Sequence, residues 1–319
     1  MAKTTRLFKS FSKLLLPIIL LLFFAAAAAA VWLTFKTAHP HNAAYLVTPE
    51  KFGQLSARAA QVTEETWTNN NNTQSRGWLL KGSDNAPAVI MLHRYGADRS
   101  HVLNMGVKLN ESTNYTILMP DARGHGDKPA LKNTSFGGCE AEDILGAIEF
   151  LRGLKTSSNN ALVGTNIGIY GVEMGAMTAI SAAGDKTIKA LVLDSVPQDS
   201  DDLLAAAVER RFPFASSITA KFAQTGTYLY FFDGCYRRNS LCETANAIGD
   251  RKVLLLAGSD APRFQDSTAK LAKCFPNTTK VESKTDLSPS GYSIINASLE
   301  QSEVYDQRVI EFFKTSLGN

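Results

Sequence analysis

The chain has 319 residues, of which 45% are hydrophobic and 20% are charged, and its formal net charge is +3. Such a length and composition predict one large globular domain with a short appendage. Several basic residues lie within the first thirteen positions, and no basic stripe with interleaved aromatic residues follows. We therefore expect no nucleic-acid partner.

The N-terminal segment is expected to anchor the protein in a membrane. No charged residue occurs from 14 to 35, a run long enough to cross a hydrocarbon core of roughly 30 Å as a helix. Positions 1–13 are basic and only Lys36 follows the run closely, so the positive-inside rule predicts a single-pass protein with an extracytoplasmic C-terminal domain, periplasmic or extracellular. A cleaved signal peptide with small residues at 25–30 is the alternative. We favour the anchor because residues 31–35 extend the apolar run beyond those small residues.

The cysteines and histidines suggest disulfides and no metal site. Cys235 and Cys242 lie close together in a polar loop and are the pair we expect in an exported domain. Cys139 and Cys274 form the other pair or remain buried thiols. No C-x-x-C occurs, and the five histidines do not combine with cysteines at zinc spacing, so we expect no metal and no cofactor.

After a linker at 36–64, short apolar runs predict strands that alternate with helices. The polar run 69–72 predicts a turn between two early strands. Expected strands lie at 77–80, 86–92, 115–119, 188–193, 252–257 and 279–282, and another begins at 167. Expected helices lie at 100–111, 139–154 and 301–315, and another, which ends near 183, follows the strand that begins at 167. Segment 199–250 interrupts the alternation and predicts a small cap. The fold class is therefore α/β over 65–319, with a mostly parallel sheet covered by helices on both faces.

One short stretch has the layout of a nucleophile elbow. Gly171-Val-Glu-Met-Gly175 follows a buried strand and precedes an alanine-rich helix, as G-x-S-x-G does. Glu173 stands where that motif has serine. We expect the functional residues at the carboxyl ends of the strands, where sites form in sheets of this kind.

Three motifs in this order resemble the α/β-hydrolase superfamily, over roughly residues 65 to 315. They are His93-Arg-Tyr-Gly-Ala-Asp-Arg-Ser100, Asp121-Ala-Arg-Gly-His-Gly126 and the elbow. The resemblance is to exported or membrane-anchored serine hydrolases with a small cap. It implies oxyanion donors at the backbone N–H of Met174 and of Arg94 or Tyr95, and a triad acid at Asp260.

The chain departs from this pattern at two triad positions. The resemblance implies a histidine around 292–296, but no histidine follows His125. Without that group a covalent intermediate would be expected to stall, so Glu173 and Asp260 are vestigial triad positions in our interpretation. Arg94 stands where the superfamily usually has glycine, and we hypothesise that it pairs with Glu173.

Several residues near the strand ends have a structural and a functional interpretation. Glu173 is either the remnant of a nucleophile position, which we favour, or a carboxylate with a raised pKa that acts as base or ligand contact. Candidate binding residues are His93, Arg94, Tyr95 and Met174, with His93 more easily understood as a loop-stabilising histidine. We expect the strand-end residues Asp121, His125 and Asp194 to hold turns.

These features favour a membrane-anchored protein of the α/β-hydrolase fold that has lost serine-hydrolase activity and acts as a binding or scaffolding module. The alternative is a divergent esterase or peptidase-like hydrolase that uses Glu173 and Asp260. Expected partners are the membrane and a small-molecule or acyl ligand, and no protein partner can be predicted. We expect the aromatic residues of the cap to pack internally rather than to form a lipid pocket; they are Phe212, Phe214, Phe222, Tyr228, Tyr230, Phe231 and Phe232.

Overall fold

A computed structural model describes residues 2–40, 45–53, 61–213 and 216–318. Its centre is an eight-stranded sheet with the order β1-β2-β4-β3-β5-β6-β7-β8. The strands are β1 (Val62–Thr68), β2 (Gln74–Leu80), β3 (Ala86–Leu92), β4 (Thr116–Pro120), β5 (Val163–Val172), β6 (Ile188–Asp194), β7 (Lys252–Leu256) and β8 (Lys280–Lys284). Strands β1 and β2 pair antiparallel to their neighbours, and the other pairings are parallel. The mostly parallel sheet is thus as predicted.

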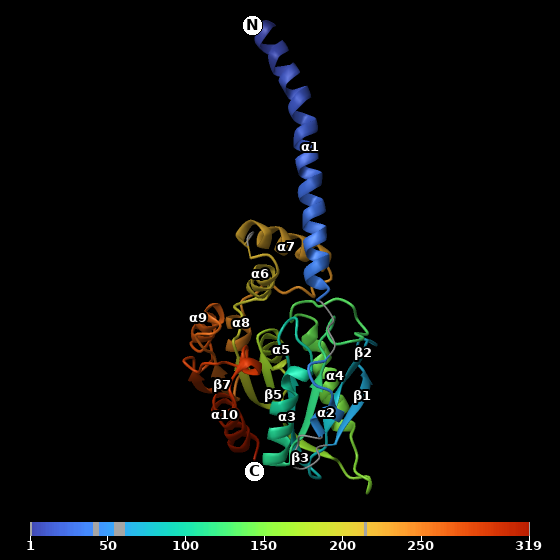
Figure 1. Ribbon diagram of the computed structural model, residues 1–319, viewed down its shortest axis with the longest axis vertical. Coiled ribbons are helices and arrows are strands. Elements are labelled where there is room, and N and C mark those ends of the chain that lie inside the picture. The colour runs from blue at the N-terminus through green and yellow to red at the C-terminus, as the bar shows by residue number, and fades with distance from the viewer. Residues whose placement is uncertain (1, 41–44, 54–60, 214–215, 319) are drawn as a thin grey trace.

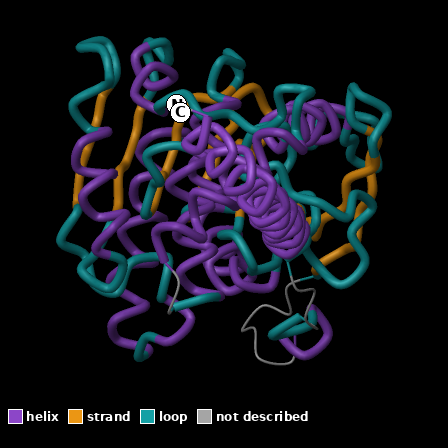
Figure 2. Tube along the Cα trace, turned by 90° about the horizontal axis from the view of Figure 1, so that it is seen from above, coloured by secondary structure: helices purple, strands orange, loops and turns teal. Residues whose placement is uncertain are grey.

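Helices cover both faces of this sheet (Figure 2). In β3, Ala88 and Ile90 pack into one buried cluster whereas Val89 and Met91 pack into the other, because successive strand residues point to opposite faces. Helices α3 (Ser100–Thr113) and α10 (Leu299–Leu317) cover one face. Helices α4 (Glu140–Gly153), α5 (Met174–Ala182), α8 (Leu241–Asn246) and α9 (Pro262–Leu271) cover the other. Continuous apolar strands are therefore explained by burial on both sides.

The segment expected to be a cap contains α6 (Ser200–Arg211), α7 (Ser216–Tyr230) and α8. Figure 1 shows α6 and α7 stacked beyond the sheet, with α7 farthest from it. Helix α6 begins with an N-cap at Asp199, whose side chain accepts a hydrogen bond from the Asp202 N–H. Two arginines, Arg210 and Arg211, end the helix, where a positive charge is favoured by the helix dipole.

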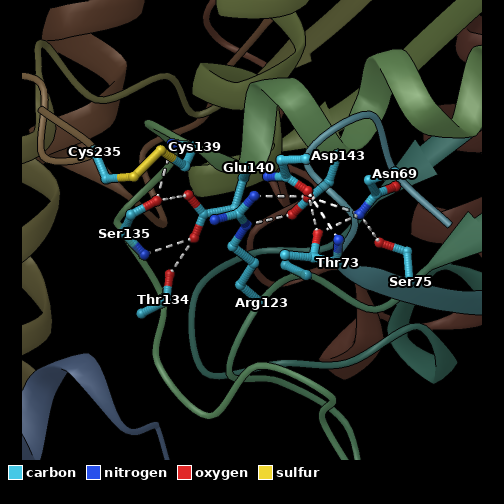
Figure 3. Close-up of polar contacts among 12 residues, drawn as sticks. Asn69, Thr73, Ser75, Arg123, Thr134, Ser135, Cys139, Glu140, Asp143 and Cys235 are labelled. Carbon is cyan, nitrogen blue, oxygen red and sulfur yellow. Dashed lines mark hydrogen bonds and ion pairs between the residues drawn. A yellow bond between two sulfur atoms is a disulfide. The ribbon is translucent and has the colours of Figure 1, made fainter. Parts of the chain in front are cut away.

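The disulfides join different residues from those expected. Cys139 is bonded to Cys235, and Cys242 to Cys274, so the predicted Cys235–Cys242 pair is wrong. Nearness in sequence misled the prediction, because the loop after α7 turns toward the start of α4 whereas α8 packs on α9. Figure 3 shows the Cys139–Cys235 bond beside the buried carboxylate of Glu140. That carboxylate accepts hydrogen bonds from four donors, namely the Thr134 Oγ1, the N–H and Oγ of Ser135 and the Gly137 N–H.

Helix α1 (Ala2–Ala38) projects from the globular part (Figure 1). From Leu15 to Ala38 it is long and apolar enough to cross a membrane. It ends against the cap, where Leu33 and Thr37 are buried and the Trp32 and Phe212 rings lie 5.4 Å apart. Helix α1 thus continues beyond Phe35, the expected end of the span. The short helix α2 (Pro49–Gly53) lies within the segment expected to be a linker.

The aromatic residues of the cap do not pack as expected. Phe231 is buried, but exposed positions are taken by Phe222, Tyr228, Tyr230 and Phe232. Phe214 lies outside the described residues. The prediction fails because the buried face of α7 is formed by the small residues Ala220, Ala223 and Thr227, which leaves large apolar side chains on the outer face.

Candidate functional site

The elbow has the backbone geometry that the glycine spacing predicts. Strand β5 ends at Val172, helix α5 begins at Met174, and Glu173 between them has φ 51° and ψ −107°. A Cβ on Gly171 would lie 2.4 Å from the Gly175 carbonyl carbon, so the turn closes only because this residue has no side chain. A non-glycine residue in such a conformation costs of the order of 1–3 kcal/mol, which the surrounding structure must offset. The chain therefore has the strained turn of a nucleophile elbow with glutamate at its central position.

The Glu173 side chain fills the site that the elbow presents. It is fully buried, and its Oε2 accepts a hydrogen bond of 2.8 Å from the Tyr95 N–H. Its Oε1 lies 3.0 Å from Nη2 of Arg210. Tyr95 N–H is one of the donors that the resemblance assigned to an oxyanion. In this structure its acceptor is a carboxylate oxygen of the protein itself.

Arg210 comes from the end of α6, and nothing in the sequence pointed to it. Its Nη1 donates a 2.7 Å hydrogen bond to the Tyr292 hydroxyl, and its guanidinium lies 5.6 Å from the ring centroids of Tyr95 and Tyr292. Burial lowers the pKa of this guanidinium, but the Glu173 carboxylate and Tyr292 outweigh burial, so the net pKa is raised. The group is therefore a permanent cation that joins the cap to the elbow.

Arg94 does not form the pair we hypothesised. Its guanidinium lies 5.1 Å from the ring centroid of Tyr292, and Nη1 is 3.4 Å from the Tyr95 carbonyl oxygen. The ion pair with Glu173 is made by Arg210 instead. Arg94 and Glu173 follow adjacent strands and therefore lie in the same region, but Arg210 of the cap contacts the Glu173 carboxylate directly.

Asp260, the expected triad acid, holds the loop before α10. It accepts hydrogen bonds from the Ser290 N–H at 3.0 Å and from the Ser290 Oγ at 2.9 Å. Asp194 holds the next residue, because its Oδ2 accepts 2.9 Å and 2.8 Å hydrogen bonds from the Gly291 N–H and the Tyr305 hydroxyl. Burial raises the pKa of Asp194 to about 6. Both carboxylates thus position a loop.

Tyr292 follows directly in this loop, at the first position of the range where the resemblance implied histidine. Burial and the nearby Glu173 carboxylate raise the pKa of its hydroxyl. A phenol with a raised pKa is a poor general base near neutral pH. The site therefore has a carboxylate at the nucleophile position and a phenol in the loop where the base was expected, and the Arg210 guanidinium contacts both.

His93 and His125 connect the loops that follow β3 and β4. His93 Nε2 accepts from the Ala122 N–H, and His125 Nε2 accepts from the Gly96 N–H, each at 3.0 Å. Burial lowers the pKa of both, to about 3 for His125. Neutral imidazoles therefore hold the loop that contains Tyr95, as the structural interpretation of these histidines expects.

Met174, the remaining candidate binding residue, does not contact the Glu173 carboxylate through its side chain. Met174 is buried under the elbow, with its Sδ 3.5 Å from Thr134 Oγ1. Within the described residues no group of three or more His, Cys, Asp or Glu side chains is arranged to hold a metal ion. The residues that meet around Glu173 are thus its direct contacts, Tyr95 and Arg210, with Arg94 and Tyr292 beside them.

Solved structures that superpose on this chain include several hydrolases. An esterase from Pyrococcus furiosus, Pf2001, superposes with a TM-score of 0.64 at 21% identity, over 89% of this chain and 99% of its own. The α/β hydrolase GrgF from Penicillium sp. sh18 superposes with a TM-score of 0.59 at 14% identity, over 81% of this chain and 100% of its own. This chain has the α/β-hydrolase fold. At these identities the likeness concerns the fold alone.

The sequence match found for this α/β-hydrolase-fold protein covers a smaller part of the chain than the structural matches do. Thiohydrolase aneE from Aspergillus aculeatus is 28% identical over 119 residues, which are 37% of this chain and 36% of the relative. The match thus spans about a third of the relative's length. No protein-family model matches the chain.

Proposed function

We propose that this α/β-hydrolase-fold protein is a membrane-anchored binding module without serine-hydrolase chemistry. The observation that carries the proposal is the position of the Glu173 carboxylate. It accepts the Tyr95 N–H and pairs with Arg210, so a negatively charged group of the protein takes the place of a reaction oxyanion. A substrate carbonyl oxygen would have to displace this ion pair.

Proton transfer is the second requirement that the geometry fails to meet. Acyl transfer by a serine hydrolase needs a base that activates the nucleophile and later a water molecule. The loop before α10 presents Tyr292, and Asp260 is engaged by Ser290. Loss of a positioned proton-transfer group costs roughly a hundredfold to ten-thousandfold in rate. Both losses together support a non-hydrolytic role.

The membrane part of the proposal rests on α1 and on charge. Residues Leu15–Ala38 can span a bilayer, and the basic residues precede them. By the positive-inside rule the hydrolase-fold domain is extracytoplasmic. Glycosylation-site mapping or protease protection of the full chain in vesicles tests this orientation, and digestion of the domain from the cytoplasmic side would contradict it.

A divergent esterase or peptidase-like hydrolase built on Glu173 and Asp260 is the second candidate. It is favoured by the esterase structures that share the fold. Glu173 would then act as nucleophile or base. That role requires the carboxylate to leave Arg210 and Asp260 to exchange its bonds with Ser290 for a bond to a catalytic group.

Reactivity separates the two candidates. A short-chain p-nitrophenyl ester should be hydrolysed by the full chain no faster than by the Glu173→Ala variant. A fluorophosphonate probe should not label the chain under either candidate, because neither has an activated serine. Glu300→Ala, which changes an exposed carboxylate on α10, is the matched control. Hydrolysis well above background that Glu173→Ala abolishes and Glu300→Ala preserves would establish the enzyme instead.

A further inference from the structure

An open pocket of about 250 Å³ lies beside the Glu173 ion pair. Its walls come from the end of α1, from the loop after β3 and from the end of α6. Tyr95 and Arg210, which hold the Glu173 carboxylate, are among the lining residues. The pocket is therefore the outer continuation of the elbow site, toward the membrane anchor.

The pocket is strongly positive. Lys36, Arg94, Arg210 and Arg211 line it, and no acidic residue is among the lining residues. Of these four cations only Arg210 forms an ion pair with a described residue, namely Glu173. The residues outside the described ranges include no Asp or Glu. Three of the cations in one pocket thus have no carboxylate side chain of the described chain as a partner.

We propose that this basic pocket, lined by Lys36, Arg94, Arg210 and Arg211, binds a phosphate group. The proposal rests on the proposed binding function and names its ligand class. Guanidinium groups form charge-assisted, often bidentate hydrogen bonds with phosphate oxygens, and three arginines and a lysine offer donors from three directions. An anion there would also offset the mutual repulsion of the four cations.

The place of the pocket makes a lipid headgroup the expected source of that phosphate. Lys36 and Thr37 lie in the last turns of α1, directly after the apolar run. A span of about 20 residues from Leu15 covers roughly 30 Å, which places Lys36 at the level of the headgroups. A soluble phosphate monoester has the same chemistry, and experiment distinguishes the two sources.

Binding is tested on the full chain in a neutral detergent. Native mass spectrometry with phosphatidic acid and with phosphatidylcholine detects the lipid source, and isothermal titration with inorganic phosphate detects the free anion. We expect phosphatidic acid to be retained in preference to phosphatidylcholine. Lys36→Gln and Arg211→Gln, which leave Glu173 and Arg210 in place, should each weaken binding about tenfold, as expected for the loss of one charge-assisted contact.

The matched control is Arg237→Gln, which removes an exposed charge of the cap outside the pocket. Binding of inorganic phosphate alone, weakened by the pocket variants, would assign the site to a soluble phosphate. The proposal is overturned if the chain retains neither anion, or if Arg237→Gln weakens binding as much as Arg211→Gln. These readouts do not depend on hydrolysis, so the reactivity tests above can fail independently.

The outer face of α7 is the basis of a second inference. Ile218, Phe222, Leu229 and Phe232 are 70%, 38%, 67% and 92% exposed. Helical spacing places Ile218, Phe222 and Leu229 on one side of α7, opposite the buried Ala223, and Phe232 follows in the turn after the helix; these four side chains form the apolar stripe. The described residues of the chain leave most of the Ile218, Leu229 and Phe232 side chains uncovered, whereas they cover the larger part of Phe222.

Helix α7 also meets α1 at the end of its apolar span. A Cβ on Gly226 would lie 2.4 Å from Thr34 Oγ1 and 2.9 Å from the Ala30 carbonyl oxygen, so the two helices are in close contact. Ala30 and Thr34 fall within the last two turns of a span of about 20 residues that begins at Leu15. Figure 1 shows α7 on the side of the cap that faces the N-terminal part of α1.

We infer that the apolar stripe of α7 lies in the membrane interface, with the bilayer as its occupant. An amphipathic helix that is held at headgroup level by a neighbouring span buries its apolar side chains at the boundary between headgroups and acyl chains. Lys221, which is exposed on the same helix, would reach the headgroups.

Depth-dependent quenching tests this placement in the full chain reconstituted into nanodiscs. The fluorescence of a nitrobenzoxadiazole label at Leu229→Cys should be quenched by doxyl-labelled lipids, and its emission maximum should shift to the blue. The control label is at Ser157→Cys, an exposed position between α4 and β5 at the amino ends of the strands. Its fluorescence should show neither the quenching nor the shift. Equal quenching at both positions would overturn the inference. So would energy transfer between labelled copies without lipid quenching, because a second chain would then cover the stripe.

Discussion

The guanidinium of Arg210 lies 3.0 Å from the fully buried carboxylate of Glu173 and joins the cap to the elbow. In an active serine hydrolase the substrate binds beside the elbow residue. In this protein the Glu173 carboxylate and the Arg210 guanidinium lie there instead. The same contact therefore bears on stability, on reactivity and on the orientation of the cap.

Replacing Arg210 by glutamine should destabilise the protein. Glu173 would remain buried without its cation, which is expected to lower the free energy of unfolding by about 2–3 kcal/mol. Urea denaturation of the full chain in detergent, followed by tryptophan fluorescence, measures the change. The double variant Glu173→Gln/Arg210→Gln should recover part of the loss, because neither charge is then left unpaired.

The control for these two variants is Arg237→Gln, which removes an exposed arginine of the same cap. It should change the free energy of unfolding by no more than about 0.5 kcal/mol. An Arg210→Gln variant as stable as the wild type would mean that the ion pair contributes nothing to folding.

Restoring serine at the elbow should not restore activity by itself. Glu173→Ser supplies a hydroxyl on the retained turn, but the loop before α10 still presents Tyr292 and no base. We expect fluorophosphonate labelling only when Tyr292→His is added, with a gain of roughly a hundredfold or more from proton transfer. The double variant Glu173→Ser/Tyr292→Phe is the control. Equal labelling of all three variants would show that position 292 does not take part.

Local patterns predicted the sheet and the elbow well. The buried strands are short apolar runs bounded by turns, and the elbow requires glycine at fixed spacing because a Cβ on Gly171 would lie 2.4 Å from the Gly175 carbonyl carbon. Such signals act over a few residues and do not depend on which residue stands at position 173. The strand ends also correctly brought Arg94 and Tyr95 to the neighbourhood of Glu173.

Long-range partners could not be predicted in the same way. Arg210 is one of two adjacent arginines at the end of a cap helix, and only the folded cap shows which of them reaches Glu173. The disulfides likewise depend on how the cap loop turns toward α4. The apolar residues of α7 have a helical spacing that is typical of a buried face, but spacing does not specify whether protein or lipid covers that face.

The neutral state of His125 predicts acid sensitivity. Burial lowers its pKa from 6.5 to about 3. Between pH 6.5 and 3 the His125 side chain is therefore protonated in the unfolded chain but not in the folded chain. This contribution to stability is fully present above pH 6.5 and is lost as the pH falls toward 3. At about 1.4 kcal/mol per pKa unit, the full loss is of the order of 5 kcal/mol.

Urea denaturation of the wild type and of His125→Gln at several pH values measures this loss. Glutamine keeps a donor and an acceptor for Arg123 and Gly96 but does not titrate. The difference in unfolding free energy between the two proteins should therefore shift in favour of the variant as the pH falls below 6.5. A difference that is independent of pH would contradict the assignment of a low pKa to His125.

The two disulfides should stabilise the protein unequally. Cys139–Cys235 closes a sequence separation of 96 residues and Cys242–Cys274 one of 32. Because a longer closed loop restricts the unfolded chain more, loss of the first bond should cost about 1 kcal/mol more than loss of the second. Paired Cys→Ser variants of each bond, compared by urea denaturation without reductant, give this difference. Limited proteolysis should also cleave the cap of the Cys139→Ser/Cys235→Ser variant faster, because that bond ties the loop after α7 to the start of α4. A larger loss from removing the Cys242–Cys274 bond would show that native packing around α8 and α9, rather than loop closure, determines the stability of the cap.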